Sequence, residues 1–583
     1  MKRILVLAFI AMGLGSCDFS NYILEQDYDF TTVFEESGGT ETATYPQIID
    51  FYEDLAAVYP SIKLEQIGET DSGEPLHLVT YSRSKSFDFE SLREDHAVVM
   101  INNGIHPGES DGIDATMMLF RDLAQDSIAL PENTVIAAIP VYNVGGALNR
   151  NSFTRTNQNG PKAYGFRGNA QNYDLNRDFI KADTRNTRSF YEIFHKVDPD
   201  LFIDTHVSNG ADYQYTLTHL FTQHDQMGGA LGNYVNKNLK PALEAALKNK
   251  DWEITPYVNV FNEVPEKGFT QFLDTPRYST GYAALWHTPG VMLETHMLKP
   301  YDKRVHGTYD FLRSMIAIAD EDAELLKKLR AQDLKAFEAK NNYAFDFKVD
   351  SSKVSELQFK GYEAERIASE VTGFERLKYD TTRPFIKPVD YYDNFAASKK
   401  VKIPQGYIVP QAWWPVLELL ELNNVEMVPF EKDTSMVVEV YTIKNYETRS
   451  TAYEGHYPHA NVEVESSREK VSIRQGDVFI PIKQKAGKYL MATIEPQAPD
   501  SFFNWNFFDS ILQQKEGFSP YVFEEIAREF LDDYPEIENE FLAKKKNEPE
   551  FASSWYAQLD WIHKQSEHYE KSHLRYPVFR VSR

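Results

Sequence analysis

The sequence predicts an α/β sandwich with a mixed sheet, followed by a β-rich region and a helical C-terminal segment. Three observations support this fold class. Short apolar runs alternate with stretches of helical periodicity up to about residue 320, which is typical of α/β proteins. Between about residues 344 and 500 the apolar runs are short and separated by polar turns. Beyond residue 500 helical periodicity returns.

The globular part is expected to begin with a helix and a β-hairpin. Apolar residues recur at helical spacing in YPQIIDFYEDLAAVYP (45–60). KLEQIGET (63–70) and PLHLVTYS (75–82) have strand patterns, and the DSGE sequence between them favours a turn. We therefore expect two antiparallel strands ahead of the main alternation of strands and helices.

Strands then alternate with helices along the chain. We predict strands in four apolar runs and helices between them; the strands are 97–103, 133–143, 200–206 and 289–296, and the helices are 114–125 and 186–197. Strands separated by helices need crossover connections, so the sheet is expected to be largely parallel or mixed. A charged helix over 320–341 is expected to close this part.

The rest of the chain is expected to form two further parts. We predict strands in MVVEVYTI (436–443), VFIPIK (478–483) and YLMATI (489–494), and a helix over 520–535. The expected boundaries are 46–343 for the α/β domain, 344–500 for a β-rich accessory region and 501–583 for a helical C-terminal segment.

The N-terminus has the pattern of an export signal. Lys2 and Arg3 precede a short apolar stretch (4–12), and LGSC then ends at Cys17, the single cysteine of the chain. This resembles a bacterial lipoprotein signal over 1–17, in which Cys17 would be lipidated and 18–45 would form a tether. We therefore expect an exported protein, anchored by lipid to a bacterial membrane on its periplasmic or cell-surface face. An ordinary secretory signal is the alternative.

The charge balance excludes some classes of partner. The chain has 87 acidic and 61 basic residues, for a formal net charge of −26. A field of this sign repels nucleic acids and anionic membrane surfaces. We therefore expect no nucleic-acid partner, and contact with the membrane through the lipid anchor only.

A metal site is predicted at the ends of two strands. His106 and Glu109 lie three residues apart in GIHPGESDG, directly after the strand 97–103. His206 ends the strand 200–206, and ligand sites of α/β sheets gather at such strand ends. Hydrolytic zinc needs three protein ligands and one open position, which these side chains can supply. Asp204 is a candidate to orient His206.

Other residue types needed for hydrolysis follow the remaining strands. Glu294, at the end of the strand 289–296, is a candidate general base that does not bind the metal. Asn176 and Arg177 in YDLNRDF could bind a carboxylate, for which a guanidinium is better suited than an ammonium group. Arg155 in FTRTNQNG could polarise the scissile carbonyl.

Taken in order, these motifs resemble the M14 zinc carboxypeptidase family over about residues 45–320. The resemblance implies a zinc carboxypeptidase-like α/β/α sandwich, one zinc ion as cofactor, and a peptide with a free C-terminus as substrate. It implies that the zinc ligands are His106, Glu109 and His206, that Glu294 is the general base, and that Asn176 and Arg177 bind the terminal carboxylate.

The resemblance leaves two positions open. Arg155 falls where the family keeps the arginine that stabilises the oxyanion, with Arg150 and Arg167 as close rivals. The family also places a tyrosine over the substrate, and PRYSTGYAAL offers Tyr278 and Tyr282. We prefer Tyr282.

The predicted function is a zinc-dependent metallocarboxypeptidase that removes C-terminal amino acids from peptides, using a zinc-activated water and a glutamate general base. One alternative keeps the zinc site but acts as a deacylase or amidase on acyl-amino acids or cell-wall peptides. A second alternative is a non-catalytic lipoprotein that binds peptides or glycans. The presence of all three ligands and the base disfavours this second alternative.

Overall fold

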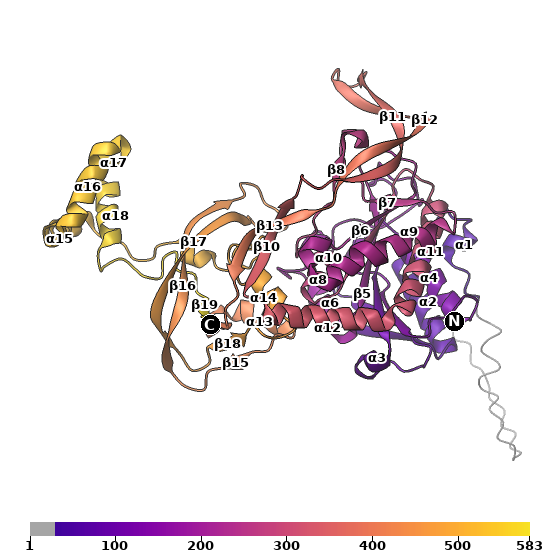
Figure 1. The fold of residues 1–583 in the computed structure, drawn as a ribbon, viewed down its shortest axis with the longest axis horizontal. Helices are drawn as coiled ribbons and strands as arrows, with labels where there is room; N and C mark the ends of the chain where they lie inside the picture. Colours follow the sequence, from indigo (N-terminus) through magenta and orange to yellow (C-terminus); the bar gives the residue numbers. More distant parts are fainter. Residues whose placement is uncertain (1–28, 583) are drawn as a thin grey trace, which may run out of the picture.

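The computed structural model describes residues 29–582 and contains an α/β part, a β-rich part and a small helical part (Figure 1). The expected signal peptide (1–17), its lipidated Cys17 and the first part of the expected tether (18–28) lie outside the described residues. Within residues 29–582, none of the helices combines the length and apolar composition needed to span a membrane.

The α/β part is built on an eight-stranded mixed sheet, as predicted. Its strand order is β1-β2-β4-β3-β5-β9-β6-β7. β3 pairs in parallel with β4 and β5, and β5 pairs in parallel with β9, whereas the β1/β2 hairpin and β6 join antiparallel. The strands are β1 (Ile62–Glu69), β2 (Pro75–Tyr81), β3 (Ala97–Asn102), β4 (Thr134–Ile139), β5 (Leu201–Ser208), β6 (Leu217–Phe221), β7 (Ile254–Pro256) and β9 (Gly290–His296).

Helices cover both faces of this sheet. Along β5, Phe202 packs against Phe190 of α6 (Arg185–Val197), whereas Thr205 lies against Gly112 of α4 (Asp111–Ala124). Side chains three apart on a strand point to opposite faces, so α6 and α4 lie on opposite sides of the sheet. α4 also packs beside α11 (Tyr301–Glu321), and α10 (Ser279–Leu285) contacts β5 and β9. The three-layer α/β/α sandwich is therefore confirmed.

The residues that follow the expected tether pack onto the sandwich. Phe30 and Phe34 belong to the main core, and the Phe34 ring meets Tyr301 edge to face. Arg150 donates hydrogen bonds to the carbonyl oxygens of Thr42 and Ala43. Because these apolar and backbone groups are buried against the domain, the α/β part begins near residue 30 rather than at 46, and a tether up to residue 45 is wrong.

The β-rich part follows α12 (Ala323–Ala339). It contains a six-stranded sheet in the order β15-β18-β14-β19-β16-β17, a β10/β13 pair, and a long β11/β12 hairpin that projects beside the α/β part (Figure 1). β12 pairs in parallel with the short β8 of the α/β part. The strands are β8 (Phe269–Thr270), β10 (Asn342–Val349), β11 (Ser355–Ala368), β12 (Glu375–Tyr392), β13 (Phe395–Lys402), β14 (Gly406–Val409), β15 (Val428–Pro429), β16 (Thr434–Thr448), β17 (His459–Ile473), β18 (Val478–Pro481) and β19 (Phe579–Val581).

Two sequence predictions in this region are wrong. YLMATI forms most of α14 (Gly487–Thr493), not a strand, and every residue of that helix is buried. A short apolar run without polar alternation fits a buried helix as well as a strand. The helical segment expected over 501–583 is also shorter, because the chain returns to the six-stranded sheet as β19.

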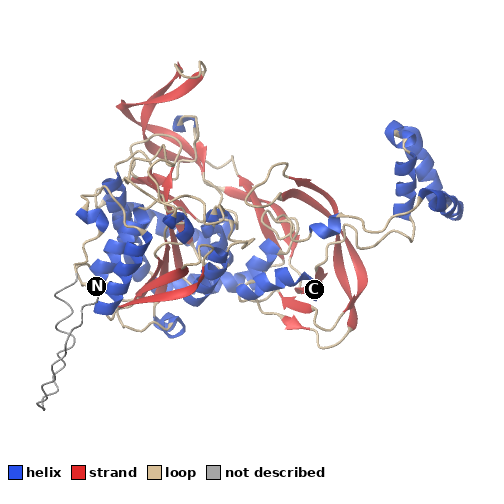
Figure 2. Ribbon diagram, turned by 180° about the vertical axis from the view of Figure 1, so that it is seen from behind, coloured by secondary structure: helices blue, strands red, loops and turns tan. Residues whose placement is uncertain are grey.

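The helices near the C-terminus form a small separate unit. α15 (Pro520–Asp533), α16 (Pro535–Asn547) and α18 (Trp555–Gln565) share their own apolar cluster, and α17 (Pro549–Ser553) contacts α16 and α18. The four helices project away from the sheet (Figure 2). The aromatic residues just before them instead belong to the main core; these are Phe502, Phe503, Trp505 and Phe508.

Candidate metal and substrate site

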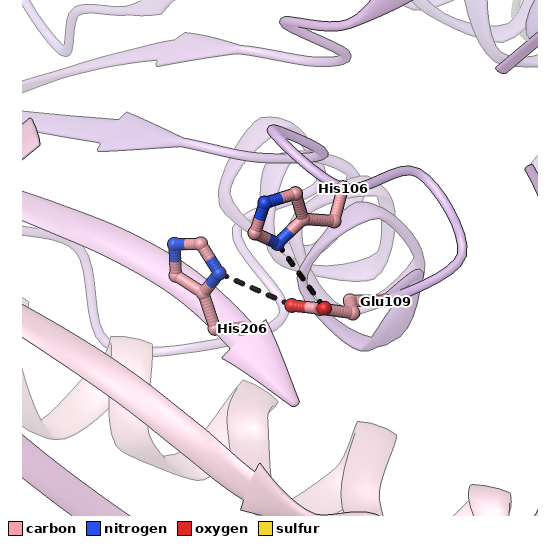
Figure 3. A group of neighbouring side chains, drawn as sticks. All are labelled: His106, Glu109 and His206. Atoms are coloured by element: carbon pink, nitrogen blue, oxygen red, sulfur yellow. Dashed lines mark hydrogen bonds and ion pairs between the residues drawn. The ribbon is translucent and has the colours of Figure 1, made fainter. Parts of the chain in front are cut away.

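Three side chains from two strand ends converge on one point. His106 and Glu109 lie in the loop between β3 and α4, where the backbone N–H of Glu109 donates to the carbonyl of His106. His206 lies on β5, the strand next to β3. Figure 3 shows the three side chains facing one another, and their ligand atoms all lie within 4.8 Å of one another. We call these residues the metal triad.

The metal triad has the donor set of a hydrolytic zinc site. The Glu109 carboxylate lies 3.1 Å from His106 Nδ1 with one oxygen and 3.1 Å from His206 Nδ1 with the other. All three side chains are buried. Two imidazoles and a carboxylate are a donor set that catalytic zinc uses, so the residues present fit this ion.

A carboxylate behind each histidine fixes which ring nitrogen faces the centre. His106 Nε2 lies 3.0 Å from Asp174 Oδ1, and His206 Nε2 lies 2.9 Å from Asp204 Oδ2. A proton held on Nε2 by these carboxylates leaves Nδ1 as the ligand atom. Asp204 therefore faces His206, as considered from the sequence. Asp174 was missed, because no local pattern connects it with His106.

The electrostatics of the triad are set by buried charges. Burial alone would raise the pKa of Glu109, but Arg155 and His106 lower it well below its usual range. Burial would lower the pKa of His206, but Asp204 and Glu109 raise it well above its usual range. The protein therefore keeps a negative carboxylate at the centre of the triad.

Glu294 lies beside the triad. It is the register partner of His206 on the neighbouring strand β9, so both side chains project from the same face of the sheet. Its Oε2 is buried and has no hydrogen-bond partner among residues 29–582. Burial raises the pKa of the Glu294 carboxyl group to about 8, and a charged His206 acts in the opposite direction. A buried carboxylate with a free oxygen can accept a proton from water.

Asn176 and Arg177 lie in the same cavity as the triad. A short 3₁₀ turn carries both residues, with Asp174 as its N-cap. Asn176 Oδ1 accepts a hydrogen bond from the backbone N–H of Ser279, and the Arg177 guanidinium lies 4.5 Å from the centre of the Tyr278 ring. Arg177 is thus a largely buried cation held in place beside the triad.

The cavity has a volume of about 240 Å³. Its walls combine apolar side chains with the polar groups described above. Asp274 also lines it, and burial raises the pKa of this carboxyl group to about 6. Besides the triad, Glu294, Asn176, Arg177 and Asp274, the cavity is lined by Arg167, Leu220, Tyr257, Asn259, Phe261, Phe272, Tyr278 and Met292, and by 207–209.

The structure separates the three candidate arginines. Arg150 donates to the backbone carbonyls of Ala43 and Thr42 and lines neither cavity near the triad. Arg155 donates to Glu109 Oε1 at 2.7 Å and to Gln158, and it lines an adjoining cavity rather than the one that holds Glu294. Arg167 lines both cavities and donates to Asp174. Of the three, Arg167 alone lines the cavity that holds Glu294, and Arg155 is paired with Glu109.

The preference for Tyr282 over Tyr278 is corrected by the structure. Tyr282 is completely buried in the aromatic core of the domain, and its hydroxyl donates to Asn423 at 2.7 Å. Tyr278 lines the cavity and stacks on Arg177. Tyr278 is the N-cap of α10 and has an extended backbone, so its side chain leaves the helix face on which Tyr282 lies.

Comparison with known families and proteins agrees with this site. Residues 48–216 match the family described as zinc carboxypeptidase, Peptidase_M14. The matched region includes the metal triad, Asn176 and Arg177, and ends before Glu294. Carboxypeptidase 2 of Trichophyton rubrum is 21% identical over 449 residues, which cover 72% of this chain and 76% of the relative. Carboxypeptidase 2 of Trichophyton equinum is 21% identical over 461 residues, covering 74% and 78%.

Solved carboxypeptidase structures resemble part of the chain. The metallo-carboxypeptidase from Burkholderia cenocepacia has a TM-score of 0.37 and 16% identity, covering 48% of this chain and 70% of that one. The metallo-carboxypeptidase from Pseudomonas aeruginosa, in complex with (2-guanidinoethylmercapto)succinic acid, has a TM-score of 0.36 and 14% identity, again covering 48% and 70%.

Proposed function

We propose that this chain is a zinc-dependent carboxypeptidase that releases C-terminal amino acids from peptides. The observation that carries the proposal is the convergence of the metal triad, Glu294 and Arg177 on one cavity. The similarity of residues 48–216 to zinc carboxypeptidases and the names of the relatives support peptide C-terminal hydrolysis.

The roles of the residues follow from their places in the cavity. When bound, zinc would supply Lewis-acid activation of water and of the scissile carbonyl, and its charge would favour the ionised form of Glu294. Glu294 would take a proton from the attacking water with its free oxygen and pass it to the leaving amine. Arg167 would donate hydrogen bonds to the developing oxyanion.

Arg177 and Asn176 would bind the free carboxylate of the substrate. A guanidinium presents several donors in a planar fork that matches a carboxylate. Acyl-amino acids carry the same carboxylate, so a deacylase would use the same pair, and the acyl side of the scissile bond would differ. Comparing peptides with acyl-amino acids as substrates distinguishes these two activities.

Replacing Arg177 tests the assignment of the protein as an exopeptidase. Arg177→Ala is expected to lower kcat/KM for peptides with a free C-terminus by at least about 30-fold, because a buried charge pair worth about 2 kcal/mol or more is lost. Peptides with an amidated C-terminus should lose much less. The measurement compares both peptides with wild type and with Arg185→Ala, an exposed arginine on the adjoining helix. Equal losses on the two peptides would contradict the role of Arg177.

We also propose that the protein is exported and held at a membrane by a lipid on Cys17. This proposal rests on the N-terminal sequence alone. Cys17→Ala is expected to move the protein from the membrane fraction to the soluble fraction of a bacterial host, and to abolish its labelling with a fatty acid. Unchanged membrane association of Cys17→Ala without labelling of wild type would exclude the lipid anchor.

A further inference from the structure

A loop of the β-rich part reaches the substrate site of the α/β part. This loop, residues 449–458, joins β16 to β17, and we call it the contact loop. Within it, Tyr453 and His456 form a bridge with backbone hydrogen bonds of 2.8 and 3.1 Å. The contact loop therefore has a defined conformation that can hold side chains in fixed positions.

The contact loop touches the segment that carries Asn176 and Arg177. Glu454 Oε2 accepts a hydrogen bond of 2.8 Å from the backbone N–H of Asp174, the residue whose side chain holds His106. His456 Nε2 lies 2.8 Å from Asp183 Oδ2 at the other end of the segment. This segment, residues 173–183, is thus held near both ends by the β-rich part.

The contact loop reaches the substrate-binding cation through Asp174. Asp174 Oδ2 lies 4.0 Å from Arg177 Nη1, and the Tyr278 ring stacks on the same guanidinium at 4.5 Å. Burial alone would lower the pKa of Arg177, but Asp174 raises it. The position of Arg177 therefore depends on Asp174, whose backbone N–H is held by Glu454.

The β-rich part also holds Arg277, the residue before Tyr278. Asp500 accepts hydrogen bonds from the backbone N–H of Arg277 at 3.0 Å and from its Nε at 2.6 Å. The Arg277 guanidinium lies over the Trp505 ring, which stacks on Tyr453. Both walls of the carboxylate site are therefore supported from the β-rich part.

The approach of the contact loop is close enough to require glycine. Gly455 has a φ of +79°, and a Cβ atom there would lie 2.6 Å from the hydroxyl oxygen of Tyr173. An L-residue would be strained in this conformation and would collide with the ring. The loop and the 173–183 segment therefore fit together directly rather than across a solvent layer.

We infer that the contact loop completes the substrate-carboxylate site, and that Glu454 is a positioning residue that holds Asp174 and, through it, the Arg177 guanidinium beside the cavity. The inference rests on the proposed function, because it assigns a partner to the cation of that site. The β-rich part is then an integral component of the peptidase, rather than an independent module for binding peptide or glycan.

The test removes one hydrogen-bond acceptor from full-length protein that begins after Cys17. Glu454→Ala is expected to raise KM about tenfold for dansyl-Gly-Ala-Phe with a free C-terminus, because Asp174 loses the bond that holds it beside Arg177. KM for the C-terminal amide should stay as in wild type. Tyr457→Phe is the matched control, since this tyrosine lies in the same loop and is half exposed.

Zinc retention and a conservative variant test the same contact with Asp174. Glu454→Ala removes the acceptor of the Asp174 N–H group and is expected to weaken both zinc retention and binding of the peptide acid. Glu454→Gln keeps an amide oxygen as acceptor and should restore both properties to near the wild-type values. Zinc retention is measured by dialysis against a chelator, so it does not depend on turnover.

The outcomes separate this inference from the proposed function. Equal KM values for Glu454→Ala and Tyr457→Phe would overturn it, as would a KM increase of the same size for acid and amide or one accompanied by a lowered Tm. If wild type does not cleave the peptide acid, the proposed function fails. Calorimetric binding of the acid to zinc-loaded Glu294→Gln, with and without Glu454→Ala, then still decides the inference: about tenfold weaker binding supports it, and unchanged or undetectable binding overturns it.

Discussion

Glu294→Gln is expected to lower kcat for peptide hydrolysis by about 10³-fold while one zinc ion per chain is retained. Glutamine has the size of glutamate but cannot accept the proton of the attacking water, and general base catalysis contributes about 10²–10⁴-fold. Glu294 Oε2 has no hydrogen-bond partner among the described residues, so an amide group at this place disrupts no network. The side chain lies outside the metal triad, which should leave the affinity for zinc nearly unchanged.

The measurement combines metal analysis of the purified protein with kcat for a mixed library of peptides. Glu244→Gln is the matched control, because Glu244 also contacts a histidine, His219, but does not line the cavity. Zinc in both variants with hydrolysis only in the control would support Glu294 as the base. Full activity of Glu294→Gln would remove it from the mechanism. Loss of zinc in this variant would make it a ligand instead.

The strand ends made this site predictable from the sequence. His106 and His206 each follow an apolar run, and parallel neighbours such as β3, β5 and β9 bring their carboxyl ends to one edge of the sheet. The pairing of β5 with β9 then places Glu294 beside His206. Periodicity therefore indicated the candidate ligands and the candidate base, and the parallel pairing of β3, β5 and β9 brings them together.

The irregular segments were not predictable in the same way. Arg150, Arg155 and Arg167 lie in a long stretch without helix or strand periodicity, so the direction of each side chain depends on a distant partner. Arg155 turns to Glu109, and Arg167 turns to Asp174. The residues around each arginine do not indicate which distant side chain it contacts.

The same limit applies to contacts between the two large parts of the chain. Glu454 meets Asp174 although 280 positions separate them, and neither residue lies in a motif that would indicate the other. The short run YLMATI failed for a different reason, because its seven-residue helix is buried on all sides and shows no polar face. Hydrophobic periodicity identifies a helix when one face is buried and the other is polar. A helix that is buried on all sides shows no such periodicity.

His206→Ala is expected to abolish both zinc binding and hydrolysis. The variant keeps only two of the three ligands, and Glu109 Oε2 loses the imidazole that lies 3.1 Å away, leaving a buried carboxylate poorly compensated. Asp204→Asn should have a smaller effect, about 10–100-fold in zinc affinity, because it changes only the group that orients the imidazole. A graded loss of this kind distinguishes a ligand from its supporting residue.

Thermal unfolding with added zinc measures this loss without turnover. Zinc at 100 times its Kd should stabilise wild type by about 2.7 kcal/mol and raise its Tm, whereas the Tm of His206→Ala should not respond. His568→Ala, which alters an exposed histidine near the C-terminus, should respond as wild type does. If zinc raised the Tm of His206→Ala as much as that of wild type, the ion would bind outside the metal triad. The proposed hydrolysis would then lose its cofactor site, even though the cavity and Arg177 remained in place.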